Sequence, residues 1–275
     1  MNKLLGFLIT ISCFSACNNN GTADNPIDPG NPTTKNAIPP IIGFSIVKTH
    51  PHDTAYFTEG LEFYNGQLLE SSGGNNDNSP YPSAMGILDI QTGKVTSKIT
   101  LNPDNHFGEG ITVFNDKLYM LTWVSGIGFV YDAKTYKKIK EFNLPTKQGW
   151  GLTHDSTSII MSDGSNNIHY LDPVSLQVKN IVGVTDNNGP VGNINELEYV
   201  NGFLYANQWE TPYILKIEAA SGKVVGRVDL SNIDSDISSR YPFTYGLNGI
   251  AYNTTSGTFF ITGKKFPIMY EIKLQ

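Results

Sequence analysis

Cysteine and charge are both scarce in this chain. Its 275 residues include two cysteines, Cys13 and Cys17, and only 16% are charged. Two cysteines exclude a four-cysteine zinc site and a dense disulfide framework. Few charges, together with 27 glycines, 15 prolines and 11% aromatic residues, argue against coiled coils, long solvent-exposed helices and intrinsic disorder. The length allows one large domain or two small ones.

Positive charge is in deficit as well, because 19 Lys and Arg face 25 Asp and Glu, a formal net charge of −6. A nucleic-acid-binding surface is therefore not expected. The histidines are scattered, and none forms the HExxH pair of a helical zinc site. They are His50, His52, His106, His154 and His169. We expect neither a catalytic metal nor a cofactor.

The apolar run at the N-terminus, Leu4–Ile11, is too short to span a bilayer. It follows Lys3 and precedes Phe14-Ser15-Ala16-Cys17, which is the form of a secretory signal. The last four residues resemble a bacterial lipobox, in which the cysteine becomes the lipidated first residue. We therefore expect residues 1–16 to be removed and Cys17 to be lipidated. A plain signal peptide cut elsewhere is the alternative.

The stretch that follows is rich in Asn, Gly, Pro and Thr, so residues 17–40 are expected to form a flexible tether behind the lipid. The folded domain is expected at residues 41–275, without a cysteine for an internal disulfide. The predicted location is the bacterial cell envelope. Asn18 in place of Asp after the lipidated cysteine favours the outer membrane.

A repeat runs through everything after the tether. Five segments each show alternating apolar residues, a turn of Asn, Gly, Asp or Ser, and a second apolar run, which is a β-hairpin pattern. The aligned apolar positions are Leu61, Ile111, Leu152, Leu197 and Ile250, at spacings of 50, 41, 45 and 53 residues. A further strand pair follows each hairpin except the last. Four strands in a unit of about 47 residues is the period of a β-propeller.

We therefore predict an all-β, five-bladed β-propeller. The last unit has room for three strands only, and the segment 43–49 before the first hairpin has no unit of its own. That N-terminal strand can complete the last blade, which closes the ring without a free edge. A β-sandwich or a pair of β domains is the alternative.

In such a ring, the start of each innermost strand and the end of the next strand lie at the same end of the central channel. The first set of positions holds Glu59, Glu109, Trp150, Asn195 and Asn248. The second holds Gly73, Trp123, Gly164, Trp209 and Lys264. Purely structural positions would look alike between units, whereas these hold acids, amides, an amine and all three tryptophans of the chain. We therefore expect a functional site here. The alternative is that the tryptophans belong to the core, the asparagines to turns, and the lysine to the solvent-exposed surface.

Family resemblance enters at the same residues. The segments that carry it are Phe57-Thr58-Glu59-Gly60-Leu61, Phe107-Gly108-Glu109-Gly110, Leu121-Thr122-Trp123, Gly149-Trp150-Gly151, Asn195-Glu196-Leu197-Glu198-Tyr199, Ala206-Asn207-Gln208-Trp209, Leu247-Asn248-Gly249-Ile250-Ala251 and Thr262-Gly263-Lys264. They resemble the plant-type and bacterial glutamine cyclotransferases, a family of five-bladed propellers. Two departures are Glu59, where many relatives have Gln, and Phe266, where they often have Trp.

The resemblance implies that an N-terminal glutamine of a peptide or protein is cyclised to pyroglutamate with release of ammonia. The residues it implies for the active site are Phe57, Glu59, Phe107, Glu109, Trp123, Trp150, Asn195, Trp209 and Lys264. We expect Glu109 to shuttle the proton, Glu59 to hold the entering ammonium, and the tryptophans to wall the pocket. Asn195 and Lys264 would donate to the carbonyl oxygen as negative charge develops. Asn248 would contact the substrate.

Two alternatives from other classes stay open. Glu59, Glu109, Asn195 and Asn248 could surround a divalent cation in a lactonase-like propeller. Lys264 argues against this, because a lysine repels a dication. The other alternative is a non-catalytic lipoprotein that binds a peptide or glycan on an aromatic rim. We expect a monomer that contacts the membrane only through its lipid.

Overall fold

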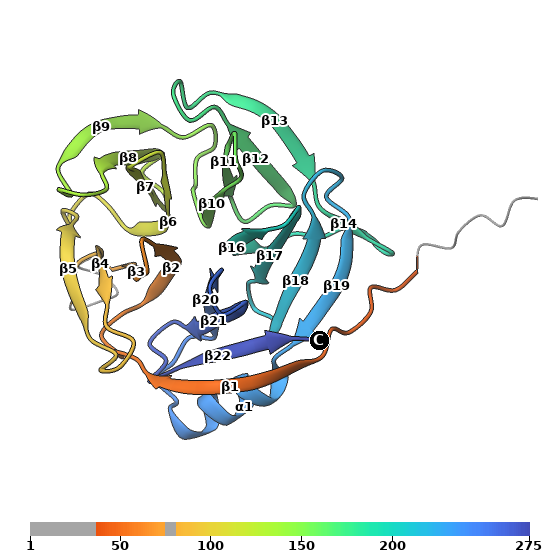
Figure 1. Cartoon of the computed structure of the whole chain (residues 1–275). Coiled ribbons are helices and arrows are strands. Elements are labelled where there is room, and N and C mark those ends of the chain that lie inside the picture. The colour runs from red at the N-terminus through yellow and green to blue at the C-terminus, as the bar shows by residue number, and fades with distance from the viewer. Residues whose placement is uncertain (1–36, 75–80) are drawn as a thin grey trace, which may run out of the picture. The chain divides into compact units, whose positions relative to one another are not determined.

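The computed structural model describes residues 37–74 and 81–275 and contains five four-stranded antiparallel sheets around a central axis (Figure 1). The first sheet has β2 (Thr58–Tyr64), β3 (Gln67–Ser72), β4 (Ala84–Leu88) and β5 (Val95–Thr100). The second has β6 (Gly108–Phe114), β7 (Lys117–Thr122), β8 (Ile127–Asp132) and β9 (Lys138–Asn143). The third has β10 (Leu152–His154), β11 (Ile159–Ser162), β12 (Asn167–Leu171) and β13 (Val178–Gly183). These sheets are the first three blades of a propeller.

The fourth blade has β16 (Ile194–Val200), β17 (Phe203–Gln208), β18 (Tyr213–Glu218) and β19 (Val224–Asp229). The fifth combines β20 (Leu247–Asn253), β21 (Thr258–Gly263) and β22 (Ile268–Leu274) with β1 (Phe44–Pro51). Antiparallel pairing of β1 with β22 runs from Phe44 opposite Leu274 to Pro51 opposite Ile268. The predicted five-bladed propeller is confirmed, and its ring is closed by the N-terminal strand.

The hairpin turns explain why this repeat folds as it does. Asn65-Gly66 and Asn201-Gly202 have positive φ at both residues, the conformation that a tight antiparallel hairpin requires and that Asn-Gly tolerates best. The five aligned apolar positions all lie in the core, none more than 2% exposed. Inward-facing apolar residues from adjacent blades fill the space between the sheets.

Two elements interrupt the repeat. Helix α1 (Ser231–Arg240) follows β19 and buries Ile233 and Ile237 in the apolar core between the fourth and fifth blades. A short hairpin of β14 (Thr185–Asp186) and β15 (Gly189–Pro190) precedes the fourth blade. Neither was expected from the sequence, because both lie in connections between repeat units.

Buried carboxylates join neighbouring blades at the channel. Glu196 of β16 accepts the backbone N–H of Ile250 at 2.7 Å and that of Leu61 at 3.3 Å, so it contacts two other blades. Glu62 of β2 accepts the N–H of Val113 at 3.1 Å. The innermost strands belong to separate sheets, and their inward N–H groups need acceptors when buried. Side-chain oxygens supply them.

The expected signal sequence 1–16, the lipidated Cys17 and most of the tether lie outside the described residues, so these remain predictions, as does placement in the cell envelope. Within residues 37–74 and 81–275, no helix is both long enough and apolar enough to cross a bilayer.

Candidate active site

Irregular pairing at the start of the innermost strands places the first set of predicted residues. In four blades the register of the inner hairpin shifts at this point, between Thr58 and Gly60, Gly108 and Ile111, Ile194 and Leu197, and Leu247 and Ile250. Each shift inserts one extra residue, a β-bulge that re-aims the local side chains. Glu59, Glu109, Asn195 and Asn248 all lie within these bulges.

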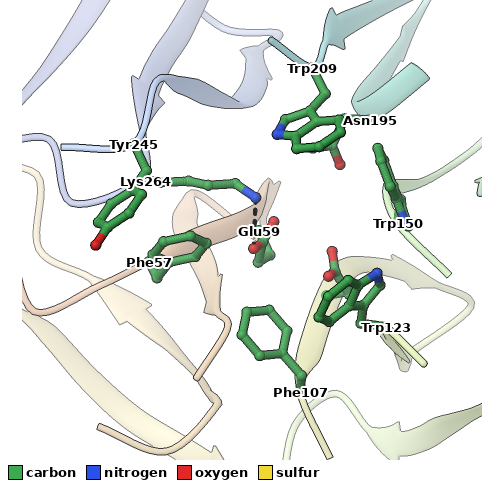
Figure 2. Close-up of a pocket in the computed structure, with 10 residues that line it drawn as sticks. Phe57, Glu59, Phe107, Trp123, Trp150, Asn195, Trp209, Tyr245 and Lys264 are labelled. Carbon is green, nitrogen blue, oxygen red and sulfur yellow. Dashed lines mark hydrogen bonds and ion pairs between the residues drawn. The ribbon is translucent and has the colours of Figure 1, made fainter. Parts of the chain in front are cut away.

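Glu59, Glu109 and Asn195 meet at a cavity of about 290 Å³ (Figure 2). The residues that line it are Phe57, Glu59, Phe107, Glu109, Trp123, Trp150, Asn195, Trp209, Tyr245 and Lys264. All nine residues that the resemblance implied are among them. The volume is close to the lower end of the roughly 300–1,000 Å³ usual for ligand sites, which suits one amino-acid residue.

Asn248, predicted to contact the substrate, is not among the residues that line the cavity. Its amide nitrogen instead donates to Glu59 Oε2 at 3.0 Å and to the carbonyl oxygen of Thr58 at 2.9 Å, and the residue is fully buried. Asn248 therefore supports Glu59 from behind.

Glu59 and Lys264 form a buried ion pair. Lys264 Nζ donates to Glu59 Oε1 at 2.8 Å, with the lysine side chain 12% exposed and the carboxylate side chain 1%. Lys264 Nζ also lies 4.8 Å from the centre of the Phe57 ring. Figure 2 shows the lysine reaching across the cavity to the carboxylate. Lys264 is thus not a solvated surface lysine, and its ammonium is available at the cavity wall.

Glu109 carries the most altered acidity in the cavity. It is 5% exposed and lines the cavity together with the carboxyl group of Glu59. Burial, followed by the negative charge of Glu59, raises the pKa of Glu109 well above its usual value. Burial also raises the pKa of Glu59, but the ammonium of Lys264 opposes that rise. Of the two carboxyl groups, Glu59 therefore ionises first, and Glu109 keeps its proton to higher pH.

Aromatic rings form the walls above this pair. Phe107 contacts Trp123 edge to face at 5.7 Å between ring centres, and Trp150 contacts Trp209 in the same way at 5.6 Å. Trp123 and Trp209 remain 38% and 42% exposed, so they are not core residues. They form a rim that an entering apolar or planar group can cover.

Glycine occupies two positions of the second predicted set for a steric reason. A side chain at Gly73 would strike the ring of Phe107. A Cβ at Gly164 would lie 2.6 Å from the Trp150 indole, and Gly164 also has φ of +81°. The glycines therefore make room for the rings that line the cavity.

Asn195 presents an unused polar atom. It is 3% exposed, and its Oδ1 has no hydrogen-bond partner among the described residues. Buried polar atoms are normally hydrogen-bonded. An amide left unpartnered in a cavity wall is suited to a polar group of a ligand.

Two residues at this site were missed in the sequence. Tyr245 lines the cavity and packs 5.3 Å from Phe57 between ring centres. Gln148 lies behind the wall, where its Oε1 accepts the indole N–H of both Trp123 and Trp150 at 3.0 Å. A signal existed for Gln148, because it precedes Trp150 by two residues just as Phe57 precedes Glu59 and Phe107 precedes Glu109.

Replacing Gln148 with leucine should loosen both indoles, because leucine has no acceptor and leaves two N–H groups unpaired. We expect KM to rise about tenfold with a smaller change in kcat, since one lost hydrogen bond is worth roughly 1 kcal/mol and two are affected. Steady-state kinetics with a Gln-initiated peptide measures this, with Gln148→Glu as the variant that keeps the acceptor. An unchanged KM in Gln148→Leu would show that the indoles hold their places without it.

Comparisons with known proteins agree on one family. The family model for glutamine cyclotransferase matches residues 21–274. A glutaminyl-peptide cyclotransferase of Arabidopsis thaliana is 35% identical over 233 residues, covering 84% of this chain and 71% of the plant protein. The crystal structure of Myxococcus xanthus glutaminyl cyclase superposes with a TM-score of 0.76 at 30% identity, covering 86% of this chain and 98% of that one. This chain belongs to the glutamine cyclotransferase family.

Proposed function

We propose that the protein is a glutaminyl-peptide cyclotransferase that converts an N-terminal glutamine of peptides or proteins to pyroglutamate and releases ammonia. The observation that carries the proposal is the buried Glu109, which has a raised pKa and lies with the Glu59–Lys264 ion pair in the wall of an aromatic cavity large enough for one amino-acid residue. Membership of the family supports the same reaction.

The raised pKa of Glu109 suits a proton shuttle. A free α-amine has a pKa of about 7.7–8.0, so the substrate arrives largely as an ammonium ion. An ordinary carboxylate would be a weak base toward that ion. Burial and the charge of Glu59 raise the pKa of Glu109, which makes its carboxylate a stronger base toward that ion.

Glu109 can carry out every proton transfer of the reaction by itself. Its carboxylate takes a proton from the α-ammonium, and the freed amine attacks the side-chain amide carbon. Glu109 then gives that proton to the departing amide nitrogen as the carbon–nitrogen bond breaks. The lactam nitrogen loses its extra proton through Glu109 to ammonia, which leaves as ammonium, and the carboxylate is restored. Because the attack is intramolecular, holding glutamine in a bent pose removes much of the barrier.

Lys264 and Asn195 stabilise the oxygen on which negative charge develops. The lysine ammonium lies at the cavity wall, and Asn195 would donate through its amide nitrogen, while its unpartnered Oδ1 can accept from a substrate N–H group. Donors that are already in place when charge appears lower the barrier most. Glu59 both holds Lys264 and, with its own negative charge, attracts the entering ammonium. The lysine beside Glu59 also makes a lactonase-like dication at these residues unfavourable.

The direct test is ammonia release from a peptide that begins with glutamine, followed with an Nα-acetylated peptide of the same sequence as control. We expect ammonia and a loss of 17 Da per molecule from the free peptide only, because acetylation removes the nucleophile. A rim that bound both peptides and released no ammonia would instead identify a non-catalytic binding protein.

The pH dependence should report the Glu59–Glu109 pair. In Glu59→Gln the negative charge that raises the pKa of Glu109 is gone, so that pKa falls. The active, ionised form of Glu109 then persists to lower pH, and the acid limb of kcat shifts to lower pH. Stopped-time ammonia assays from pH 5 to 9 measure it. An unshifted limb would mean that the two carboxyl groups do not interact in solution.

A further inference from the structure

A second cavity, of about 340 Å³, lies at the other end of the same innermost strands. Strand β2 begins with Glu59 at the active-site cavity and ends with Glu62 and Phe63 at this one. Strand β16 likewise leads from Asn195 to Glu198 and Tyr199. The two cavities share no lining residue. We call the second one the far cavity.

Three carboxyl groups line the far cavity, those of Glu62, Asp155 and Glu198, and that of Glu62 is incompletely paired. Glu62 is 6% exposed; its Oε1 accepts the Val113 N–H, whereas its Oε2 has no partner within the described parts of the chain. Glu198 uses Oε1 to accept the N–H of Tyr252 at 3.2 Å. Burial and the neighbouring carboxylate of Glu62 raise the pKa of Glu198. A positive ligand would relieve both the unpaired oxygen and this repulsion.

The remaining wall combines four aromatic rings with His154 and the small polar residues Thr153, Ser156 and Thr254. Phe63, Phe114, Tyr199 and Tyr252 line the cavity, and no Lys or Arg is among the described residues around it. The one basic ring is His154, whose Nε2 lies 3.7 Å from Glu62 Oε1 and whose side chain is one third exposed. Ring faces attract ammonium ions as carboxylates do, and the two together select an organic cation.

We propose that the far cavity binds a primary alkylammonium ion, of the kind carried by a lysine side chain or a small aliphatic amine. The ammonium would pair with Glu62 Oε2, and its alkyl chain would cover the rings. The volume and the rings are poorly matched to a bare metal ion. In the described part of the chain, no three His, Cys, Asp or Glu are grouped so that they could hold one.

Glu196 lies between the far cavity and the active-site cavity. Its two carboxylate oxygens are occupied by the N–H groups of Leu61 and Ile250, midway along the same strands. An amine in the far cavity therefore contacts none of the residues that line the active-site cavity. Amine binding in the far cavity can therefore be measured separately from competition with substrate in the active-site cavity.

Isothermal titration calorimetry of the full-length protein with n-butylammonium chloride tests the proposal, with sodium chloride and 1-butanol as controls for charge and chain. We expect saturable binding of the amine only. Glu62→Gln keeps the acceptor for Val113 and removes the charge, so affinity should fall at least about tenfold. Glu198→Gln should weaken it likewise, which covers the case that Glu62→Gln does not fold. The exposed Glu141→Gln, a matched change elsewhere, should bind as wild type does.

The active site must be separated from the far cavity in the same experiment. Glu109→Gln should retain amine binding if the amine occupies the far cavity. Loss of binding in Glu109→Gln, with wild-type affinity in Glu62→Gln, would overturn the proposal in favour of the active site. So would the absence of any heat with the wild-type protein. Tighter binding of calcium chloride that Glu62→Gln abolishes would replace the amine with a metal.

Discussion

Glu109→Gln is expected to lower kcat by about a thousandfold while the protein stays folded, within the 10²–10⁴ range of general acid–base catalysis. Glutamine has nearly the shape of glutamate but cannot accept and return a proton. The carboxyl group it replaces is buried in the cavity wall together with that of Glu59, and an amide of the same shape can occupy its place. The substitution should therefore remove the shuttle and preserve the cavity.

Single-turnover ammonia release measures this loss, and substrate binding to the variant should remain close to that of the wild type. Glu198→Gln is the matched control, since it removes another buried carboxyl group of the channel that does not line the active-site cavity. Activity of Glu109→Gln within tenfold of wild type would assign the proton transfer to another group.

Lys264→Met should have the second-largest effect, on both rate and stability. The donor to the developing oxyanion is lost, which we expect to lower kcat about a hundredfold. Glu59 is left as a buried charge without its partner at 2.8 Å, and breaking a buried pair in this way costs roughly 3–5 kcal/mol. The free energy of unfolding should fall by about that amount.

The double variant Lys264→Met, Glu59→Gln separates the two effects. It removes both charges of the pair, so stability should largely return, while kcat should stay low because the oxyanion donor is still missing. Urea unfolding and ammonia release on the same preparations provide the comparison. Recovery of activity together with stability would mean that Lys264 acts only by neutralising Glu59.

The fold could be predicted from the sequence because the repeat places residues of the same type at the same point in every unit. Leu61 and its four equivalents recur because every blade buries one side chain there, and the turns between strands carry residues that accept positive φ. The topology of a propeller then predicts where each residue lies around the central channel. For this reason Glu59 and Lys264, which are far apart in the sequence, were expected at the same site. Their pairing at 2.8 Å needed the structure.

What the repeat could not foresee lies in the connections or depends on side-chain direction. Helix α1 and Tyr245 fall between β19 and β20, where the chain follows no periodic pattern. Asn248 occupies the same bulge position as Asn195, but its amide points to Glu59 and away from the cavity. Spacing cannot distinguish these two directions, because the same backbone irregularity produces both.

The pairing of β1 with β22 also determines how the ring would respond to mechanical load. Phe44 lies opposite Leu274, so both ends of the ring emerge at the same corner of the fifth blade. A force that separates these two ends loads the hydrogen bonds of the pair one after another, as in unzipping, and not all at once. The propeller should therefore open first at this seam under low force, while the four blades made of consecutive strands remain intact.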